Sequence, residues 1–176
     1  MKWKNNQKKL ILKQNNKFII LDIDGVLATS TQYYLKPTSK SWLKKFNVYP
    51  FDKKCVYVFN EILRETNAEI ILSSDWRFHF NLEQLDEIFK LNNVIKSPIN
   101  CTLDLSYYFE NKNQISKIRQ FEIKEYLKKN NIKSYVVIDD LDLSESFDKE
   151  FIRCAKENEG IKQSGIKEKI IKVLNK

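Results

Sequence analysis

The chain has 176 residues, and a hydrophobic fraction of 42% with 12% aromatic residues is typical of a folded globule. Only 3 glycines and 3 prolines are available for flexible segments, which argues against long disordered regions or linkers, so we expect one domain. A formal net charge of +8 favours polyanionic partners such as nucleic acids or nucleotides, although a solvated lysine-rich surface explains the same excess.

The start of the chain and its cysteines show no targeting or disulfide pattern. The apolar run Leu10-Ile11-Leu12 is too short for a signal peptide or a membrane span, so we expect a cytoplasmic protein with no membrane attachment. The three cysteines, Cys55, Cys101 and Cys154, are odd in number and far apart, which fits neither a disulfide framework nor a zinc site. We therefore expect reduced thiols and no disulfide-linked partner.

A Lys/Asn-rich lead over residues 1–17, with a short edge strand expected at residues 9–13, precedes the predicted domain over residues 18–176. The first strong strand is predicted at Phe18 to Ile23, where a continuous apolar run is interrupted by a carboxylate and followed by a second carboxylate and a glycine. A polar stretch separates this strand from the rest of the domain.

From residue 52 onward, the predicted strands and helices alternate. In chain order they are a helix from Lys53 to Thr66 capped by Asp52, a strand from Ala68 to Leu72, a helix from its cap Asn81 to Leu91, a short strand at Val94 to Ile95, a loop from Ser97 to Asn111, a long helix from Asn113 to Asn130, strands from Tyr135 to Ile138 and from Phe151 to Ala155, and a helix from Gly165 to Asn175 capped by Ser164. This alternation predicts a single Rossmann-like, three-layer α/β domain with a central parallel sheet.

Three of the predicted strands lead into acidic or hydroxyl side chains. The groups are Asp22 with Asp24, Ser73 with Ser74 and Asp75, and Asp139 with Asp140. Ligands of parallel α/β sheets bind at the carboxyl ends of the strands, so the sequence predicts that these three groups converge on one crevice.

Asp22 and Asp24 form a candidate Mg²⁺ site. Side chains two residues apart in a strand face the same side, and Gly25 allows the chain to turn sharply just beyond them. Two neighbouring carboxylates repel each other, and a divalent cation removes that conflict while it offers a site for a phosphate oxygen. An acidic turn after a core strand is the alternative interpretation of this segment taken alone.

The elements at these strand ends, together with a cation on the long helix, resemble those of the haloacid dehalogenase (HAD) superfamily of phosphohydrolases over nearly the whole chain. Asp22-Ile23-Asp24-Gly25-Val26 is similar to the first HAD motif. The resemblance implies that Asp22 is the nucleophile that forms an aspartyl-phosphate, and that Asp24 is the general acid and base. A second carboxylate in this motif favours a phosphatase over a dehalogenase.

The resemblance also implies phosphate-binding residues. Ile70-Ile71-Leu72-Ser73 is similar to the second motif, whose hydroxyl holds a phosphoryl oxygen, and Ser74 is the alternative to Ser73. The third motif is a cation that neutralises the phosphoryl group, and Arg119 resembles it, with Lys117 as its competitor. An exposed helix position is the other interpretation of either cation.

Asp139-Asp140 is similar to the fourth motif. The resemblance implies that Asp139 is a direct Mg²⁺ ligand beside Asp22 and the backbone carbonyl of Asp24. Asp140 is then expected to orient a metal-bound water or another side chain. Mg²⁺ takes few protein ligands and keeps several waters, so this small set is adequate.

A narrower resemblance is to the small HAD domain of bacterial and viral RNA-repair proteins, the Swiss Army Knife proteins, which is thought to remove phosphate from nucleic-acid ends. The similar segments are Ala68 to Arg77, Arg119 with Glu122-Ile123 and Tyr126-Leu127, Tyr135 to Asp140, and Gly160-Ile161. The chain departs from that pattern at Asp75, which separates Ser74 from Trp76, and by the absence of a glycine before Arg119.

The short intervals between the motifs leave room for a minimal cap at most, and an open crevice suits a phosphate on a bulky molecule. We therefore expect a Mg²⁺-dependent phosphatase acting on phosphorylated DNA or RNA ends, with Trp76 and Arg77 as candidate substrate-binding residues. Core packing is the alternative role for such aromatic residues. His79, the sole histidine, is interpreted as structural or as a substrate contact. The alternative functions are a small-molecule phosphatase such as a nucleotidase, a phosphoprotein phosphatase, or a module that only binds phosphorylated ends.

Overall fold

The computed structural model describes residues 17–33 and 45–176. Within them, five parallel strands form one sheet in the order β3-β2-β1-β4-β5. The strands are β1 (Lys17–Leu21), β2 (Glu69–Leu72), β3 (Asn100–Cys101), β4 (Ser134–Asp139) and β5 (Phe151–Arg153). The predicted α/β class with a central parallel sheet is therefore confirmed. The edge strand expected at residues 9–13 lies outside the described residues.

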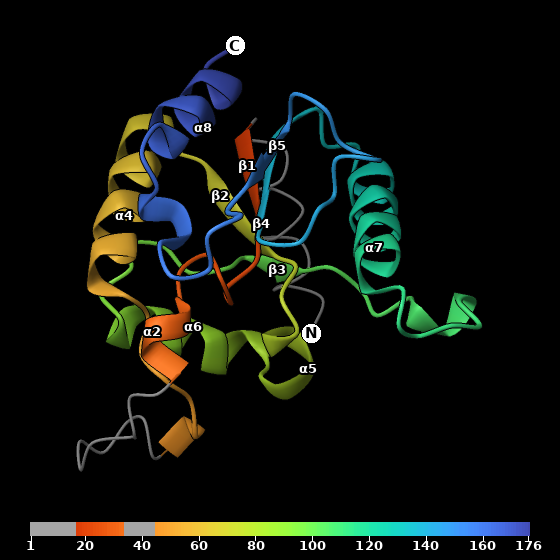
Figure 1. Cartoon of the computed structure of the whole chain (residues 1–176), viewed down its shortest axis with the longest axis horizontal. Helices are drawn as coiled ribbons and strands as arrows, with labels where there is room; N and C mark the ends of the chain where they lie inside the picture. The colour runs from red at the N-terminus through yellow and green to blue at the C-terminus, as the bar shows by residue number, and fades with distance from the viewer. Residues whose placement is uncertain (1–16, 34–44) are drawn as a thin grey trace, which may run out of the picture.

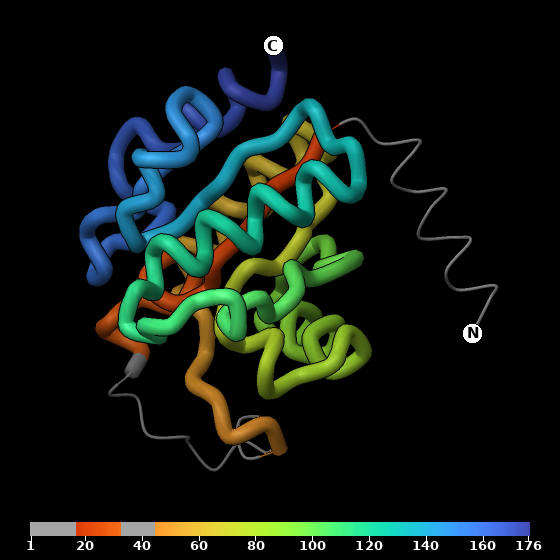
Figure 2. Tube along the Cα trace, turned by 90° about the vertical axis from the view of Figure 1, so that its right-hand side faces the viewer, coloured from red at the N-terminus to blue at the C-terminus, as the bar shows by residue number. Residues whose placement is uncertain are grey.

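Helices cover both faces of the sheet. They are α2 (Ser30–Tyr33), α4 (Lys53–Thr66), α5 (Trp76–His79), α6 (Leu82–Leu91), α7 (Ile115–Asn130) and α8 (Ile166–Leu174), with short 3₁₀ turns η1 (Ser106–Tyr108) and η2 (Gly160–Lys162). Figure 1 shows α4 and α8 on one side of the sheet and α7 on the other. Seen from the side of α7, this helix lies lengthwise over the central strands (Figure 2). The domain therefore has the three layers that the sequence predicts.

The central position of β1 follows from its uninterrupted apolar sequence. Alternating side chains of a strand face opposite sides. Ile19 and Leu21 pack into the larger core with α4, α6 and α8, whereas Phe18 and Ile20 pack into a second core with α7. Because both faces are covered, every position from Phe18 to Leu21 must be apolar, and the exit of β1 is fixed in the middle of the sheet.

The predicted capping residues differ in outcome. Asp52 caps α4 by accepting hydrogen bonds from the backbone N–H groups of Lys54 and Cys55, and Asn81 caps α6 in a capping box. The prediction for Ser164 is wrong, because Gly165, with a φ of 80°, precedes α8 and provides no side-chain cap. The residue at the cap position is therefore a glycine, which adopts the left-handed region readily, and not the serine that the sequence predicts.

The strand predicted at Val94 to Ile95 is also wrong. The N–H of Val94 bonds to the carbonyl of Phe89, and the N–H of Ile95 bonds to the side chain of Asn60, so neither residue joins the sheet. The edge strand is instead β3, inside the segment predicted as a loop. Two apolar residues in sequence are too few to distinguish a strand from a turn that buries one side chain.

None of the helices in the described residues combines the length and the apolar character that a membrane-spanning helix requires. None of Cys55, Cys101 and Cys154, all within the described residues, belongs to a disulfide, and Cys55 and Cys154 are buried.

Candidate active site

The loop after β1 turns tightly at the carboxyl edge of the sheet. Asp22 extends the ladder through its N–H, which bonds to the carbonyl of Ile138 at 3.0 Å. The chain then reverses at Gly25, whose φ is 69°. A Cβ at Gly25 would lie 2.5 Å from Oδ2 of Asp140, so only glycine lets this loop approach the end of β4.

Three carboxylates from two neighbouring strands meet at this edge. Asp22, Asp139 and Asp140 each offer an oxygen within 4.8 Å of the others, and Asp22 and Asp139 are buried. Burial and the charge of Asp22 raise the pKa of Asp139, and burial, Asp22 and Glu157 raise the pKa of Asp140 to about 6. Burial also raises the pKa of Asp22, against the opposing effect of Arg119. The positive charge near these three carboxyl groups is therefore too small to offset their burial and mutual repulsion.

Arg119 of α7 contacts two of these carboxylates, those of Asp22 and Asp139. Its Nη1 lies 3.3 Å from Oδ1 of Asp22 and 3.1 Å from Oδ2 of Asp139, and its Nη2 donates to Asp75 at 3.0 Å. The side chain is 5% exposed. Burial by itself would lower the pKa of Arg119, but Asp22, Asp139 and Asp75 raise it, so the guanidinium stays charged.

Lys117, the sequence-based competitor of Arg119, lies elsewhere. It is exposed and lines a separate surface pocket with Gln120, Lys124 and Glu145. Residues two apart on an α-helix point in nearly opposite directions, so Lys117 and Arg119 cannot both face the sheet edge. The structure thus leaves Arg119 as the candidate phosphate-neutralising cation.

The two candidate hydroxyls after β2 have different surroundings. The N–H of Ser73 bonds to the carbonyl of Leu21, and its hydroxyl lies 3.4 Å from that of Thr102. The hydroxyl of Ser74 lies beside Asp22 and favours its charged form. This hydroxyl is fully buried without a hydrogen bond of standard geometry. Ser74, the sequence-based alternative, is therefore the better placed of the two.

Asp24 stands next to the cluster and is held by two aromatic side chains. Tyr49 donates its hydroxyl hydrogen to Oδ1 of Asp24, and Trp76 donates Nε1–H to Oδ2 at 3.0 Å. Burial raises the pKa of Asp24, while the bond from Tyr49 lowers it, Asp22 raises it, and the bond from Trp76 lowers it, with a net rise. A carboxyl with a raised pKa is suited to proton transfer.

The side chains of Trp76 and Arg77 are mostly buried, although each borders a surface cleft. Trp76 is 6% exposed and packs against Tyr49 and Phe51. The guanidinium of Arg77 bonds to Glu122 and to the carbonyl of Ser74, with a side chain that is 3% exposed. Nε1 of Trp76 and both Nη atoms of Arg77 already donate to protein groups, so these two residues position their neighbours.

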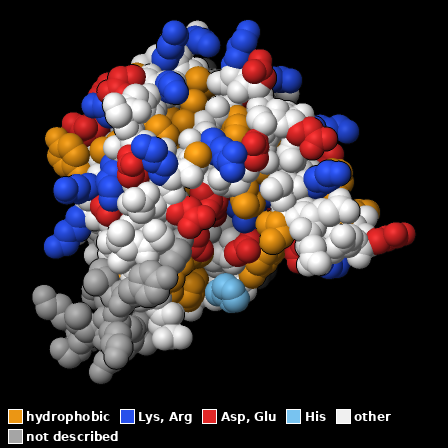
Figure 3. Space-filling view, viewed as in Figure 1, with side chains coloured by type: hydrophobic (Ala, Val, Ile, Leu, Met, Phe, Trp, Pro, Cys, Tyr) orange, Lys and Arg blue, Asp and Glu red, His pale blue; other side chains and the backbone are white. Residues whose placement is uncertain are grey.

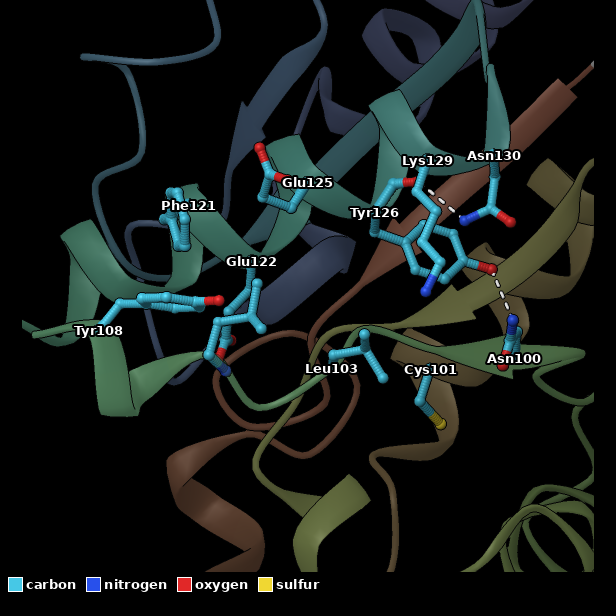
Figure 4. Close-up of a pocket in the computed structure, with 11 residues that line it drawn as sticks. Asn100, Cys101, Leu103, Tyr108, Phe121, Glu122, Glu125, Tyr126, Lys129 and Asn130 are labelled. Atoms are coloured by element: carbon cyan, nitrogen blue, oxygen red, sulfur yellow. Dashed lines mark hydrogen bonds between the residues drawn. The ribbon is translucent and has the colours of Figure 1, made fainter.

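Asp22, Asp24 and Asp140 line a cleft of about 150 Å³, whose other lining residues are Asp75, Ile115, Arg119 and Leu141. Figure 3 shows acidic side chains near the middle of this face of the molecule, with Lys and Arg side chains around them. A separate pocket of about 320 Å³ lies between the segment after β3 and α7, where Leu103, Phe121 and Tyr126 provide apolar walls (Figure 4). None of the carboxylates of the cluster lines that pocket, so we do not regard it as the catalytic site.

Sequence reasoning missed Tyr49 and Glu122 as partners of the site. Tyr49 lies in a polar stretch without a periodic pattern, and no local signal points from it to Asp24. The sequence marks Glu122 only as part of a segment similar to the family, yet Glu122 is buried and accepts hydrogen bonds from Arg77 and from the N–H of Leu105. The signal in the sequence is that Glu122 lies on the apolar side of the predicted helix. A charged side chain buried there needs a partner, and this indicates a contact with a cation or an N–H group.

Comparison with known families gives one match. The model described as the HAD domain in Swiss Army Knife RNA repair proteins matches residues 18–164. Searches of curated proteins and of solved structures found no match.

Proposed function

The chain belongs to the family of HAD domains in Swiss Army Knife RNA repair proteins, and on this basis we propose that it is a Mg²⁺-dependent phosphatase that acts on phosphorylated nucleic-acid ends. The observation that carries the proposal is the position of Asp22. Asp22 lies beside the cation Arg119 and beside the carboxylates of Asp139 and Asp140, with the Asp24 carboxyl next to it.

The donor set fits a divalent cation. Three carboxylates with raised pKa values lie close together, and Arg119 contacts two of them, so an added positive charge would relieve both their repulsion and the cost of burying them. Asp22, Asp139 and Asp140 would hold the ion, and oxygen ligands of this kind suit Mg²⁺. When bound, Mg²⁺ would neutralise charge on the transferring phosphoryl group.

In the first proposed step, an oxygen of Asp22 attacks the phosphorus of the substrate. The bond from phosphorus to the ester oxygen breaks, and the proton of Asp24 moves to that oxygen, so the alcohol leaves neutral. Arg119 and the hydroxyl of Ser74 would receive the phosphoryl oxygens, because both lie beside the Asp22 carboxylate.

In the second step, water attacks the phosphorus of the aspartyl-phosphate. Asp24, now a carboxylate, takes a proton from the water while the bond from phosphorus to Asp22 breaks. Inorganic phosphate leaves, Asp22 is again a carboxylate, and Asp24 is again protonated. Tyr49 and Trp76 would hold Asp24 in place through both transfers, since they bond to its two oxygens.

A nucleic-acid end is the favoured substrate because the family is that of RNA repair proteins and the net charge of the chain is +8. A small-molecule phosphatase predicts efficient turnover of free nucleotides, with no gain from oligonucleotides. A phosphoprotein phosphatase predicts a preference for phosphopeptides.

The test is phosphate release from 3′- and 5′-phosphorylated DNA and RNA oligonucleotides, free nucleotides and phosphopeptides, with and without Mg²⁺. We expect Mg²⁺-dependent turnover of one oligonucleotide end, and a loss of roughly 10³-fold or more in Asp22→Asn. Asp142→Asn is the matched control, because Asp142 is an exposed carboxylate just beyond β4. Full activity of Asp22→Asn would reject the nucleophile, and a preference for free nucleotides would make the chain a metabolic phosphatase.

A further inference from the structure

A larger cavity adjoins the cleft above Asp22 at Asp24. It measures about 460 Å³ and is lined by Asp24, Phe46, Asn47, Val48, Tyr49, Asp75, Trp76, His79 and Phe80. We call it the Asp24 pocket. It shares Asp24 and Asp75 with the cleft above Asp22, so the two spaces adjoin. Its volume lies within the range of roughly 300–1,000 Å³ that is usual for small-molecule sites.

The geometry of phosphoryl transfer indicates which part of the substrate would reach this pocket. The attacking and leaving oxygens lie roughly in line on opposite sides of the phosphorus. The attack comes from Asp22, and the leaving oxygen must reach the proton of Asp24. The group attached to that oxygen therefore extends past Asp24 and away from Asp22. The Asp24 pocket is the adjoining space that Asp24 lines and Asp22 does not.

The lining of the pocket selects a neutral, flat group. Two carboxylates, Asp24 and Asp75, belong to the wall, and no Lys or Arg is among the described lining residues. A second phosphate would be repelled there. The wall is otherwise rich in aromatic side chains, and rings pack well against other rings in stacked or edge-to-face arrangements.

Two exposed polar side chains complete the lining. Asn47, in the left-handed region with a φ of 52°, and His79, at the end of α5, are both exposed. Figure 3 shows the histidine on the same face as the central acidic side chains, next to hydrophobic ones. The amide of Asn47 and the ring nitrogens of His79 can each donate and accept hydrogen bonds, as the edge of a nucleobase requires.

We propose, resting on the phosphatase function above, that the Asp24 pocket receives the base of the terminal nucleotide that carries the phosphate, with His79 and Asn47 as specificity-determining residues. The remaining phosphates of the strand then pass outside this pocket. The chain accordingly distinguishes a strand end that bears a base from one that lacks it.

The test uses two oligonucleotides that differ only in the phosphorylated terminal residue, which is a normal nucleotide in one and an abasic residue in the other. We expect kcat/KM to be about tenfold or more higher for the end with a base, in keeping with the worth of stacking one base. In His79→Ala and Asn47→Ala this ratio should fall several-fold toward one. Tyr57→Ala is the matched control, because Tyr57 is an exposed aromatic residue of α4 that does not line the pocket.

The outcomes separate the two proposals. If both oligonucleotides are hydrolysed equally by the wild type, the chain is a phosphatase but the assignment of the pocket is wrong. A higher kcat/KM for a phosphotyrosyl peptide would assign the pocket to an aryl side chain and overturn the nucleobase. Absence of turnover on every phosphorylated end would reject the phosphatase function and this inference with it.

Discussion

Trp76 donates its indole Nε1–H to Oδ2 of Asp24 at 3.0 Å, which joins the first turn of α5 to the loop that follows β1. Tyr49 bonds to the other oxygen of the same carboxylate. Asp24 is thus held by two segments far apart in the sequence, and its orientation depends on packing among Tyr49, Phe51 and Trp76.

Replacing Trp76 with Phe tests whether this hydrogen bond matters for proton transfer. Phe keeps an aromatic ring against Phe51 but removes the donor. We expect kcat to fall about tenfold or more, since a hydrogen bond to a charged group is worth about 1.5–3 kcal/mol. The loss should shrink for an aryl phosphate whose leaving group needs no proton, and equal losses on both substrates would contradict the role given to Asp24.

Arg119 and Lys117 of α7 give a second prediction. Arg119→Ala removes the charge between Asp22 and Asp139 and should lower kcat/KM about a hundredfold or more, as for other groups that stabilise transition-state charge. Lys117→Ala removes an exposed charge on another face and should change kcat/KM less than threefold, in line with the small worth of exposed charges. Kinetics of both variants on one substrate decide the question, and the reverse order would exchange their roles.

A third prediction concerns the metal. Asp139→Asn removes one of the three converging carboxylates, so the rise in Tm that Mg²⁺ causes in the wild type should be lost. Without Mg²⁺ the Tm should not fall, because burial already disfavours the charged form of Asp139. Asp142→Asn, in an exposed loop, should respond to Mg²⁺ as the wild type does. An unchanged Mg²⁺ titration in Asp139→Asn would remove Asp139 from the site.

The helix cap of α4 predicts a pH dependence of stability. Asp52 accepts from two backbone N–H groups and pairs with Lys162, and although burial alone would raise the pKa of Asp52, these partners lower it below its usual value. A lowered folded-state pKa means that the stabilisation is present above the unfolded pKa and is lost as the pH falls through the folded one. Asp52→Asn should lower the free energy of unfolding by about 1 kcal/mol at pH 7.

Urea unfolding of both proteins at pH 7 and pH 3 checks this expectation. The difference between the wild type and Asp52→Asn should narrow as the pH falls below about 4, where Asp52 becomes protonated in the unfolded and then in the folded chain. A difference that stays constant over this range would show that the ion pair with Lys162 contributes nothing.

The sequence by itself determined the fold class and the order of the elements at the sheet edge. The apolar run from Phe18 to Leu21 can only be a strand covered on both faces, and the carboxyl ends of parallel strands share one edge. The convergence of Asp22, Ser74 and Asp139 is therefore a consequence of local pattern and topology. Helix α4 agrees with its predicted bounds, because its periodicity and its cap are both local signals.

Only the tertiary structure decided which side chains face one another across this edge. The choice of Arg119 over Lys117 depends on the rotation of α7 against the sheet, and the choice of Ser74 over Ser73 depends on how the chain leaves β2. The hydrogen bond from Tyr49 to Asp24 joins two segments that no common sequence pattern relates. Contacts between distant segments are set by packing of the whole core, which a local pattern does not record.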